Sequence, residues 1–235
     1  MWYVTAQKNG ASAMGLQRVL GLGQYQTAWT WLHKLRRAMV RPGRERLAGT
    51  VEADAVYVGG EAPGKPVRSL GKQALVAVAV EERGAGMGRI RLQRVANASA
   101  ASLEAFLLQA VEPGSLIRTD GRPSYSRLQA LGYRHEQVVT GADRARPEQD
   151  FARVHRVAAL LKRWLLGTHQ GAVQNQHLDY YLDEFTFRFN RRTSRSRGLL
   201  CYRLMQQAVL TGAVPRKTIQ RGSSGQEIVR EGSVE

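Results

Sequence analysis

The 235-residue sequence has a single cysteine, Cys201, and few features of a secreted or membrane protein. One cysteine cannot form a disulfide within the chain, and it excludes a zinc ribbon built on cysteine ligands. There is no run of about 18 apolar residues, so no membrane-spanning helix is predicted. The first ten residues, MWYVTAQKNG, lack the charged segment and apolar run of a secretory signal peptide. These absences predict a cytoplasmic protein.

Acidic residues are also scarce, because 19 Asp and Glu stand against 35 Lys and Arg, which gives a net charge of +16. Such an excess favours a polyanionic partner, either nucleic acid or an anionic membrane surface. Attraction to phosphates is the commonest use of this charge, so we expect nucleic acid and no membrane partner. Hydrophobic residues make up 43% of the chain, enough for one large domain with a sizeable core.

Residues 12–20 and 25–40 are predicted to form two helices separated by the glycine-containing turn GLGQ. Ser12 is a suitable N-cap for the first helix, because its hydroxyl can accept a hydrogen bond from the first turn. The apolar residues of the second helix recur at helical spacing: Ala28, Trp31, Leu32 and Leu35. This outline is typical either of a helix-turn-helix-like DNA-binding segment over residues 1–40 or of a plain helical hairpin.

Residues 41–48 read as a linker, and the sequence after them alternates between strand and helix patterns. Strands are predicted at 50–58, 73–82, 88–97, 115–121 and 134–139, and helices at 99–111 and 124–132. The first three strands favour an antiparallel meander, whereas the later strand–helix–strand units imply parallel pairing. This order predicts an α/β fold: a ribonuclease H-like mixed sheet flanked by helices and preceded by a small helical segment. The domain would span residues 49–212, followed by a disordered polar tail, 213–235.

Two aspartates occupy positions where a ligand could bind. Asp54 lies inside the strand TVEADAVYV, on the same face as Glu52 and Val56, and Asp120 ends the strand LIRTD. A ribonuclease H-like sheet places its first and fourth strands side by side, so the two carboxylates would face each other. A divalent cation would relieve their repulsion. The alternative is that Asp120 caps the turn DGRPSY and that Asp54 is a solvated strand residue.

The segment VHRVAALLKRWLLG, residues 154–167, is predicted to be an amphipathic helix that ends at Gly167. Its apolar face comprises Val154, Val157, Ala158, Leu161, Trp164 and Leu165. His155 and Lys162 are seven residues apart, nearly two full turns, so both fall at the edge of this face. From the geometry alone, His155 is either a half-exposed helical residue or part of a functional site.

The segment HLDYYLDEFTFRFNRR is predicted to be a second helix, with an apolar stripe at Leu178, Leu182, Phe185 and Phe189. A polar stripe contains Glu184, Arg188 and Arg191, and a Glu184–Arg188 pair would support the helix as part of a salt-bridged surface row. The sequence RRTSRSRG follows, with arginines at positions 191, 192, 195 and 197. Such a cluster suits phosphate contacts or forms a solvated basic loop.

Four stretches taken together resemble bacterial insertion-sequence transposases with an ISXO-like, DDE-type catalytic domain: VEADAVYVGG, TDGRPSY, VHRVAALLKRWLLGTHQGAV and HLDYYLDEFTFRFNRR. The resemblance covers about residues 5–210, with the motifs in order. It implies hydrolysis of DNA at the transposon ends and transfer of the freed 3′-OH into target DNA. It also implies that Asp54 and Asp120 bind Mg²⁺ or Mn²⁺ in a two-metal site.

His155 matches the family's third acidic position, and Lys162 matches the basic residue that follows it seven positions later. A histidine there could be a metal ligand, which suits Mn²⁺ better than Mg²⁺, a contact to the scissile phosphate, or a proton carrier. Lys162 would contact a DNA phosphate. The resemblance also matches Glu184 and Arg191 to a Glu–Arg pair of the family, and Arg188, Arg192 and Arg195 are accessory or phosphate-contact candidates.

The partners that the resemblance implies are double-stranded DNA, at the transposon ends and at the target, and further copies of the chain on that DNA at the nucleoid. Related proteins often begin with a Cys-rich zinc ribbon, which this sequence lacks, so recognition of transposon ends would be weakened. The chain would be a natural short version, a truncated remnant or the product of a mis-assigned start. Three functions stay open: an active transposase, a non-catalytic DNA-binding remnant, and a ribonuclease H-like nuclease that cuts without joining.

Overall fold

The structure is a computed structural model, and it describes residues 1–41, 43–59, 73–138, 152–170 and 173–222. The chain divides into two compact units. One unit comprises Glu45–Arg163, and the other comprises Met1–Arg44 together with the described residues from Trp164 onward. The segment GGEAPGKPVRSLG, residues 59–71, which the sequence indicates to be a basic loop, falls almost entirely outside the described residues.

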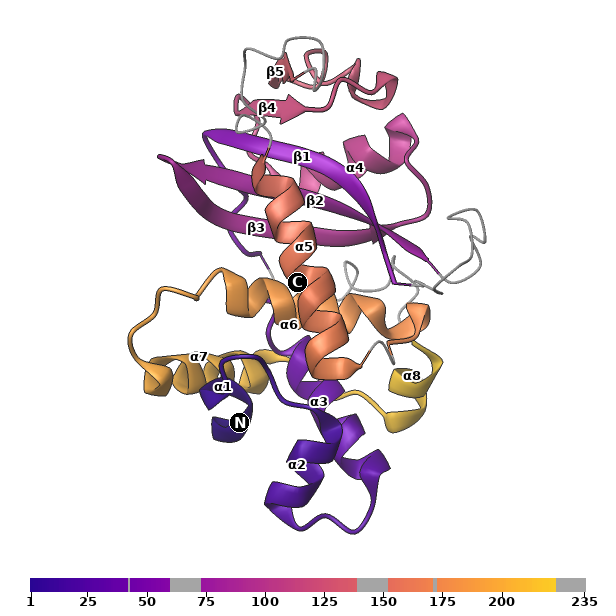
Figure 1. The fold of residues 1–235 in the computed structure, drawn as a ribbon, viewed down its shortest axis with the longest axis vertical. Coiled ribbons are helices and arrows are strands. Elements are labelled where there is room, and N and C mark those ends of the chain that lie inside the picture. Colours follow the sequence, from indigo (N-terminus) through magenta and orange to yellow (C-terminus); the bar gives the residue numbers. More distant parts are fainter. Residues whose placement is uncertain (42, 60–72, 139–151, 171–172, 223–235) are drawn as a thin grey trace. The chain divides into compact units, whose positions relative to one another are not determined.

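The unit Glu45–Arg163 contains a mixed five-stranded sheet of order β3-β2-β1-β4-β5 (Figure 1). Its strands are β1 (Thr50–Val58), β2 (Ala74–Arg83), β3 (Gly86–Val95), β4 (Leu116–Thr119) and β5 (Arg134–Gln137). The pairs β1–β2 and β2–β3 are antiparallel, and the pairs β1–β4 and β4–β5 are parallel. This confirms the predicted ribonuclease H-like sheet, with the first and fourth strands as neighbours.

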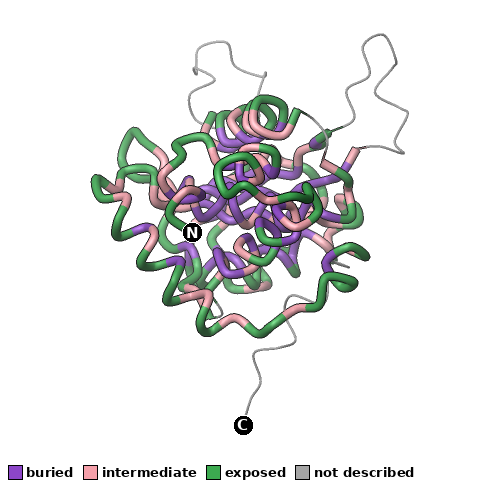
Figure 2. Tube along the Cα trace, turned by 90° about the horizontal axis from the view of Figure 1, so that it is seen from below, coloured by how far each residue is buried: buried purple, intermediate pink, exposed green. Residues whose placement is uncertain are grey.

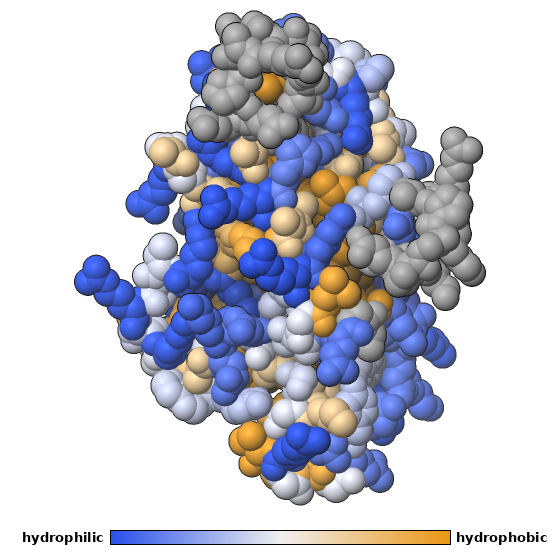
Figure 3. All heavy atoms as spheres, in the orientation of Figure 1, coloured by the Kyte–Doolittle hydropathy of each residue, from blue (hydrophilic) through white to orange (hydrophobic). Residues whose placement is uncertain are grey.

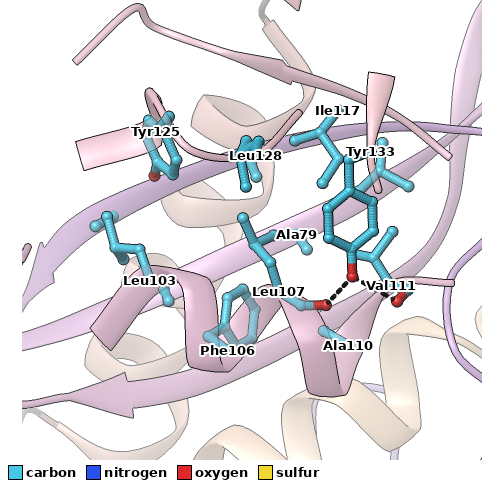
Figure 4. Packing of buried hydrophobic residues seen from close by; sticks show 14 of the residues in the cluster. Ala79, Leu103, Phe106, Leu107, Ala110, Val111, Ile117, Tyr125, Leu128 and Tyr133 are labelled. Carbon is cyan, nitrogen blue, oxygen red and sulfur yellow. Dashed lines mark hydrogen bonds between the residues drawn. The ribbon is translucent and has the colours of Figure 1, made fainter. Parts of the chain in front are cut away.

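Helix α4 (Ala100–Ala110) covers one face of this sheet. Its Leu103, Phe106 and Leu107 pack against small residues of β1 and β2, including Ala53 and Ala79, in the cluster drawn in Figure 4. The hydroxyl of Tyr133 lies within hydrogen-bonding distance of two carbonyls at the end of α4, to which its one hydrogen can be donated. The residues of β1 and β2 in this cluster are alternate ones along each strand, as side-chain alternation predicts for one face of a sheet.

The opposite face of β1 and β2 is met by helix α5 (Ala152–His169), of which residues 152–163 belong to this unit. The predicted apolar face of α5 is confirmed, because Val154, Val157 and Leu161 are fully buried. Gly167 does not end the helix, which continues to His169. The left-handed residue that follows it is Gln170, with φ 51°. In Figure 2 the buried residues lie in the interior of the trace.

The second unit is helical. It contains α1 (Trp2–Ala6), α2 (Ala13–Leu20), α3 (Tyr25–Arg37), the end of α5, α6 (Leu178–Phe189), α7 (Arg197–Leu210) and α8 (Arg216–Arg221). Ser12 accepts a hydrogen bond from the Gly15 N–H, which confirms it as the N-cap of α2. The two predicted helices and the turn between them are present as α2 and α3. On α3, however, Trp31 is exposed, whereas Trp29 packs against His33.

The core of this helical unit contains residues from both ends of the sequence. Leu16, Leu32, Phe187 and Leu204 belong to one buried cluster. A second group of rings surrounds His33 and includes Trp29, His177, Tyr180 and Tyr181. Burial and the charge of Arg36 lower the pKa of His33 to about 2 and that of His169 to about 4, so both imidazoles are neutral.

The division of the chain differs from the predicted domains 1–40, 49–212 and 213–235. The described residues from Trp164 to Leu210 belong instead to the unit that contains the N-terminal helices, and Phe187 of α6 and Leu204 of α7 share its buried cluster. The prediction of a linker over residues 41–48 is wrong at Leu47, which is fully buried and pairs with Val111. The prediction of a disordered tail is wrong for residues 216–221, which form α8 with a buried Ile219. Residues 223–235 lie outside the described residues.

One predicted helix is also wrong, because residues 124–132 form only the short 3₁₀ helix η1 (Pro123–Tyr125) and a series of turns. Tyr125 and Leu128 anchor this segment in the core beneath α4. Gly132, with φ 84°, then reverses the chain into β5. The segment is held by the burial of two apolar side chains rather than by helix periodicity.

Candidate active site

The parallel pairing of β1 with β4 determines where the two aspartates lie. Glu52 on β1 is opposite Arg118 on β4, and Asp54 and Asp120 each follow two residues later. Asp54 points to the face of β1 opposite α4 and is only 5% exposed. Asp120 comes directly after β4, at the edge where ligands collect in open α/β sheets.

Arg122 joins the two carboxylates. Its Nε lies 2.7 Å from Asp120 Oδ2, and its Nη1 lies 3.7 Å from Asp54 Oδ1. The backbone N–H of Arg122 also donates to Asp120 Oδ1, at 3.3 Å, so Asp120 stabilises the turn as well. The turn interpretation of Asp120 and its position beside Asp54 are therefore compatible.

The electrostatics of Asp54 reflect burial and its neighbours. Burial raises the pKa of Asp54 above its usual range, and the Ala55 N–H, which donates to Asp54 Oδ1 at 2.6 Å, opposes this. The negative charge of Asp120 raises the pKa further, whereas Arg122 and His155 lower it. Asp54 is thus a carboxylate whose charged form gains from added positive charge.

Tyr125 is a second buried group that responds to both carboxylates. Burial and the charges of Asp54 and Asp120 raise the pKa of its hydroxyl well above the usual range. The Tyr125 side chain is 2% exposed and forms part of the core under α4. A buried hydroxyl from the core under α4 therefore lies close enough to the site to respond to the charge of both carboxylates.

Glu52 fixes the start of α5 against the sheet. Its carboxylate accepts hydrogen bonds from the backbone N–H groups of Arg153, at 2.9 Å, and Val154, at 3.0 Å. It also accepts from Arg153 Nη1 at 2.7 Å, and Glu52 itself is fully buried. A carboxylate at this place satisfies unpaired donors of the first helical turn and complements the helix dipole.

His155 lies one residue beyond this cap, in the first turn of α5. It is exposed at the surface, and its positive charge contributes to lowering the pKa of Asp54. Lys162 is also exposed, two turns further along the same helix. The structure therefore brings His155 into the electrostatic neighbourhood of Asp54 and leaves Lys162 accessible.

The donor chemistry of Asp54 and Asp120 fits a hard divalent cation, because both offer carboxylate oxygens and share one positive partner. Within the part of the chain that the structure describes, no three His, Cys, Asp or Glu side chains converge tightly enough to hold a metal. His155 is therefore near the pair without completing a three-ligand cluster.

Glu184 and Arg188 lie in the helical unit and form a buried network. Glu184 is fully buried and pairs with Arg36 at 2.8 Å and with Arg188 at 2.7 Å. The predicted i,i+4 pair is confirmed, but it is an interior pair and not a surface row. Arg188 also donates to the carbonyls of Val4 and Gln7. These contacts link α6 to α1 and α3 within the unit.

The arginines after α6 differ in accessibility. Arg191 stacks on Phe187, with its guanidinium carbon 4.2 Å from the ring centroid, and Arg192 stacks on Phe189 at 4.1 Å. Burial lowers the pKa of Arg191, and its side chain is only partly accessible. Arg192 and Arg195 are exposed and remain candidates for phosphate contacts. The face of the molecule shown in Figure 3 is largely hydrophilic.

Two residues of the site were missed in the sequence analysis: Arg122 and Glu52. Glu52 shares the strand face of Asp54, and a buried acid two residues from a candidate ligand was an available signal. Arg122 follows Asp120 by two residues in the turn DGRPSY, but its double ion pair depends on the β1–β4 pairing. Only the fold reveals that partnership.

A family model described as the ISXO2-like transposase domain matches residues 46–190, which is more than half of the chain. The chain belongs to this family. The match spans β1 to β5, α5 and α6, and so includes Asp54, Asp120, His155 and Glu184. Among the described residues of this family member, no helix combines the length and apolar character of a membrane span.

Solved structures with a distant likeness to this chain include an intasome and two Mos1 complexes. An intasome of simian T-cell lymphotropic virus in complex with PP2A regulatory subunit B56 gamma shares 16% identity over 87% of this chain and 70% of that chain, with a TM-score of 0.42. A pre-cleavage Mos1 transpososome shares 12% over 89% and 80%, with a TM-score of 0.30. The Mos1 mariner paired-end complex with Mn shares 13% over 84% and 79%, with a TM-score of 0.27. A search of curated proteins found no match.

Proposed function

We propose that this protein is the DNA transposase of an insertion sequence, which hydrolyses a phosphodiester at each transposon end and transfers the 3′-OH into target DNA. The observation that carries the proposal is the pair of carboxylates, Asp54 on β1 and Asp120 directly after the neighbouring β4, in an ISXO2-like domain. The net charge of +16 supports double-stranded DNA as the partner.

Asp54 and Asp120 would hold Mg²⁺ or Mn²⁺, a two-metal site being the expectation. When bound, these ions stabilise charge on the attacking and leaving oxygens of the phosphodiester. Asp54 supplies its carboxylate from a buried position, where electrostatic interactions are stronger than in bulk water. Asp120 supplies the second carboxylate from the end of β4. His155 would contact the scissile phosphate or carry a proton from its exposed position beside them.

DNA would be held by accessible basic residues. Lys162 would contact a phosphate near the cut, and Arg192 and Arg195 would contact phosphates from the helical unit. The pair of helices α2 and α3 would act as the helix-turn-helix-like DNA-binding segment. Such an enzyme would act as a homo-oligomer on paired transposon ends, at the nucleoid.

The test is cleavage of a labelled duplex that carries the DNA flanking the gene, with Mn²⁺ present. Wild type should nick the duplex at the transposon end, and Asp54→Asn should lose cleavage while binding the duplex as tightly or more tightly, because one negative charge is removed. Arg127→Gln, a change of an exposed arginine that lies 3.9 Å from Glu104, is the matched control and should cleave normally. Equal cleavage by wild type and Asp54→Asn would refute the assignment.

Two alternatives give different products in the same assay. A non-catalytic DNA-binding remnant would bind the duplex without cutting it. The exposed basic residues Lys162, Arg192 and Arg195 would serve this function as well as they would serve catalysis. A ribonuclease H-like nuclease would cut the duplex but leave no joined strands. The carboxylate pair favours catalysis over the remnant, and joined products would exclude the nuclease.

A further inference from the structure

The positively charged guanidinium of Arg122 lies between the carboxylates of Asp54 and Asp120. Its Nε is 2.7 Å from Asp120 Oδ2, and its Nη1 is 3.7 Å from Asp54 Oδ1. Asp54 Oδ1 also accepts from the Ala55 N–H. Arg122 therefore supplies positive charge to the same oxygens that a divalent cation would need.

A divalent cation and the guanidinium cannot both sit against these oxygens without strong repulsion, since like charges at such short separation oppose each other. The Arg122 side chain can leave readily, because it is 47% exposed and forms no part of the core. Its backbone would remain in place, held by the Asp120 carboxylate and by the turn into η1. The geometry thus allows exchange by rotation of one side chain.

We infer that Arg122 is an internal counter-ion which holds Asp54 and Asp120 together before metal binds and competes with the divalent cation for them. The inference rests on the proposed function and concerns the regulation of the same site. A displaced guanidinium would need another anion, and the substrate that approaches this site offers phosphates. Metal binding and DNA binding would then strengthen each other, because coupling between two ligands is reciprocal.

The test is a titration of the folded protein with Mn²⁺ in the absence of DNA, in which binding is measured from the relaxation of water protons. Arg122→Gln should bind Mn²⁺ about tenfold more tightly than wild type, since it removes both the competitor and a repelling charge. Arg122→Lys keeps the charge but loses the two-nitrogen fork, so its affinity should fall between the two. Arg127→Gln, which changes another exposed arginine of the same turn region, should match wild type.

If Arg122 had only a structural role, its substitution would lower the thermal stability of the protein without tightening Mn²⁺ binding. Melting curves are therefore measured without metal for each variant. Adding duplex DNA should tighten Mn²⁺ binding by wild type and leave Arg122→Gln nearly unchanged. Equal or weaker Mn²⁺ binding by both Arg122 variants would overturn the inference. Asp54→Asn and Asp120→Asn separate this from the proposed function: Mn²⁺ binding that survives both changes refutes the metal site itself.

Discussion

The hydrogen-bonded contact between Glu52 and the start of α5 gives a quantitative prediction for Glu52→Gln. The buried carboxylate accepts three hydrogen bonds, from the backbone of Arg153 and Val154 and from Arg153 Nη1. Glutamine keeps the shape but replaces one acceptor oxygen with an NH₂ donor, which would face donors on α5. Arg153 would retain Glu82, at 3.3 Å, as a partial partner. We expect the free energy of unfolding to fall by about 3 kcal/mol.

The assay is urea unfolding followed by far-UV circular dichroism, with hydrogen exchange to locate the loss. Exchange should accelerate first at the Arg153 and Val154 amides, because these lose their acceptor. The control is Glu45→Gln, whose side chain is 75% exposed and pairs with Arg89 at 3.1 Å. A surface pair of this kind should contribute less than about 1 kcal/mol. Equal destabilisation by the two variants would refute the role given to Glu52.

Three further predictions concern the helical unit. Glu184→Gln should destabilise the protein by about 3 kcal/mol or more in urea unfolding, because it leaves the buried Arg36 without a counter-charge, and a loss below about 1 kcal/mol would contradict this. The depressed pKa of His33, about 2, means that the unfolded chain binds the proton first below about pH 6.5, so stability falls as the pH drops. Between pH 6.5 and 5.5 wild type should lose about 1 kcal/mol more than His33→Phe, and parallel pH profiles would contradict the buried neutral imidazole. Changing both Arg192 and Arg195 to Gln should reduce the salt dependence of DNA binding by roughly two phosphate contacts, and an unchanged slope in a salt titration would exclude them.

The sheet could be predicted from the sequence because its strands carry local signals. The alternation in TVEADAVYV predicted a strand at 50–58, which are the observed bounds of β1. The order of the later elements predicted β4 as the neighbour of β1. The helix predicted at 124–132 failed because Tyr125 and Leu128 are held by long-range packing under α4. Local periodicity does not report such packing.

The domain boundary and part of the site depend on contacts between distant residues. The apolar stripe of α6 was predicted correctly, since its four residues are buried, but the place of α6 in the helical unit depends on contacts such as that of Arg36 with Glu184. In the same way, the positions of Asp54 and Asp120 follow from strand order, whereas the bridge formed by Arg122 requires side-chain geometry. Residue types suggested the site, and only the fold supplied its internal counter-ion.

Strand transfer from a pre-cut end is the most direct measure of whether Asp54 and Asp120 form a transposase active site. A labelled duplex ending in the transposon 3′-OH is incubated with supercoiled plasmid, Mn²⁺ and the protein, and joined products are measured. We expect joining by wild type and none by Asp120→Asn, with both proteins folded and bound to the duplex. Joining by Asp120→Asn would contradict the assignment of Asp54 and Asp120 as the centre of a transposase. The same holds if wild type binds both Mn²⁺ and the duplex but gives no joined products.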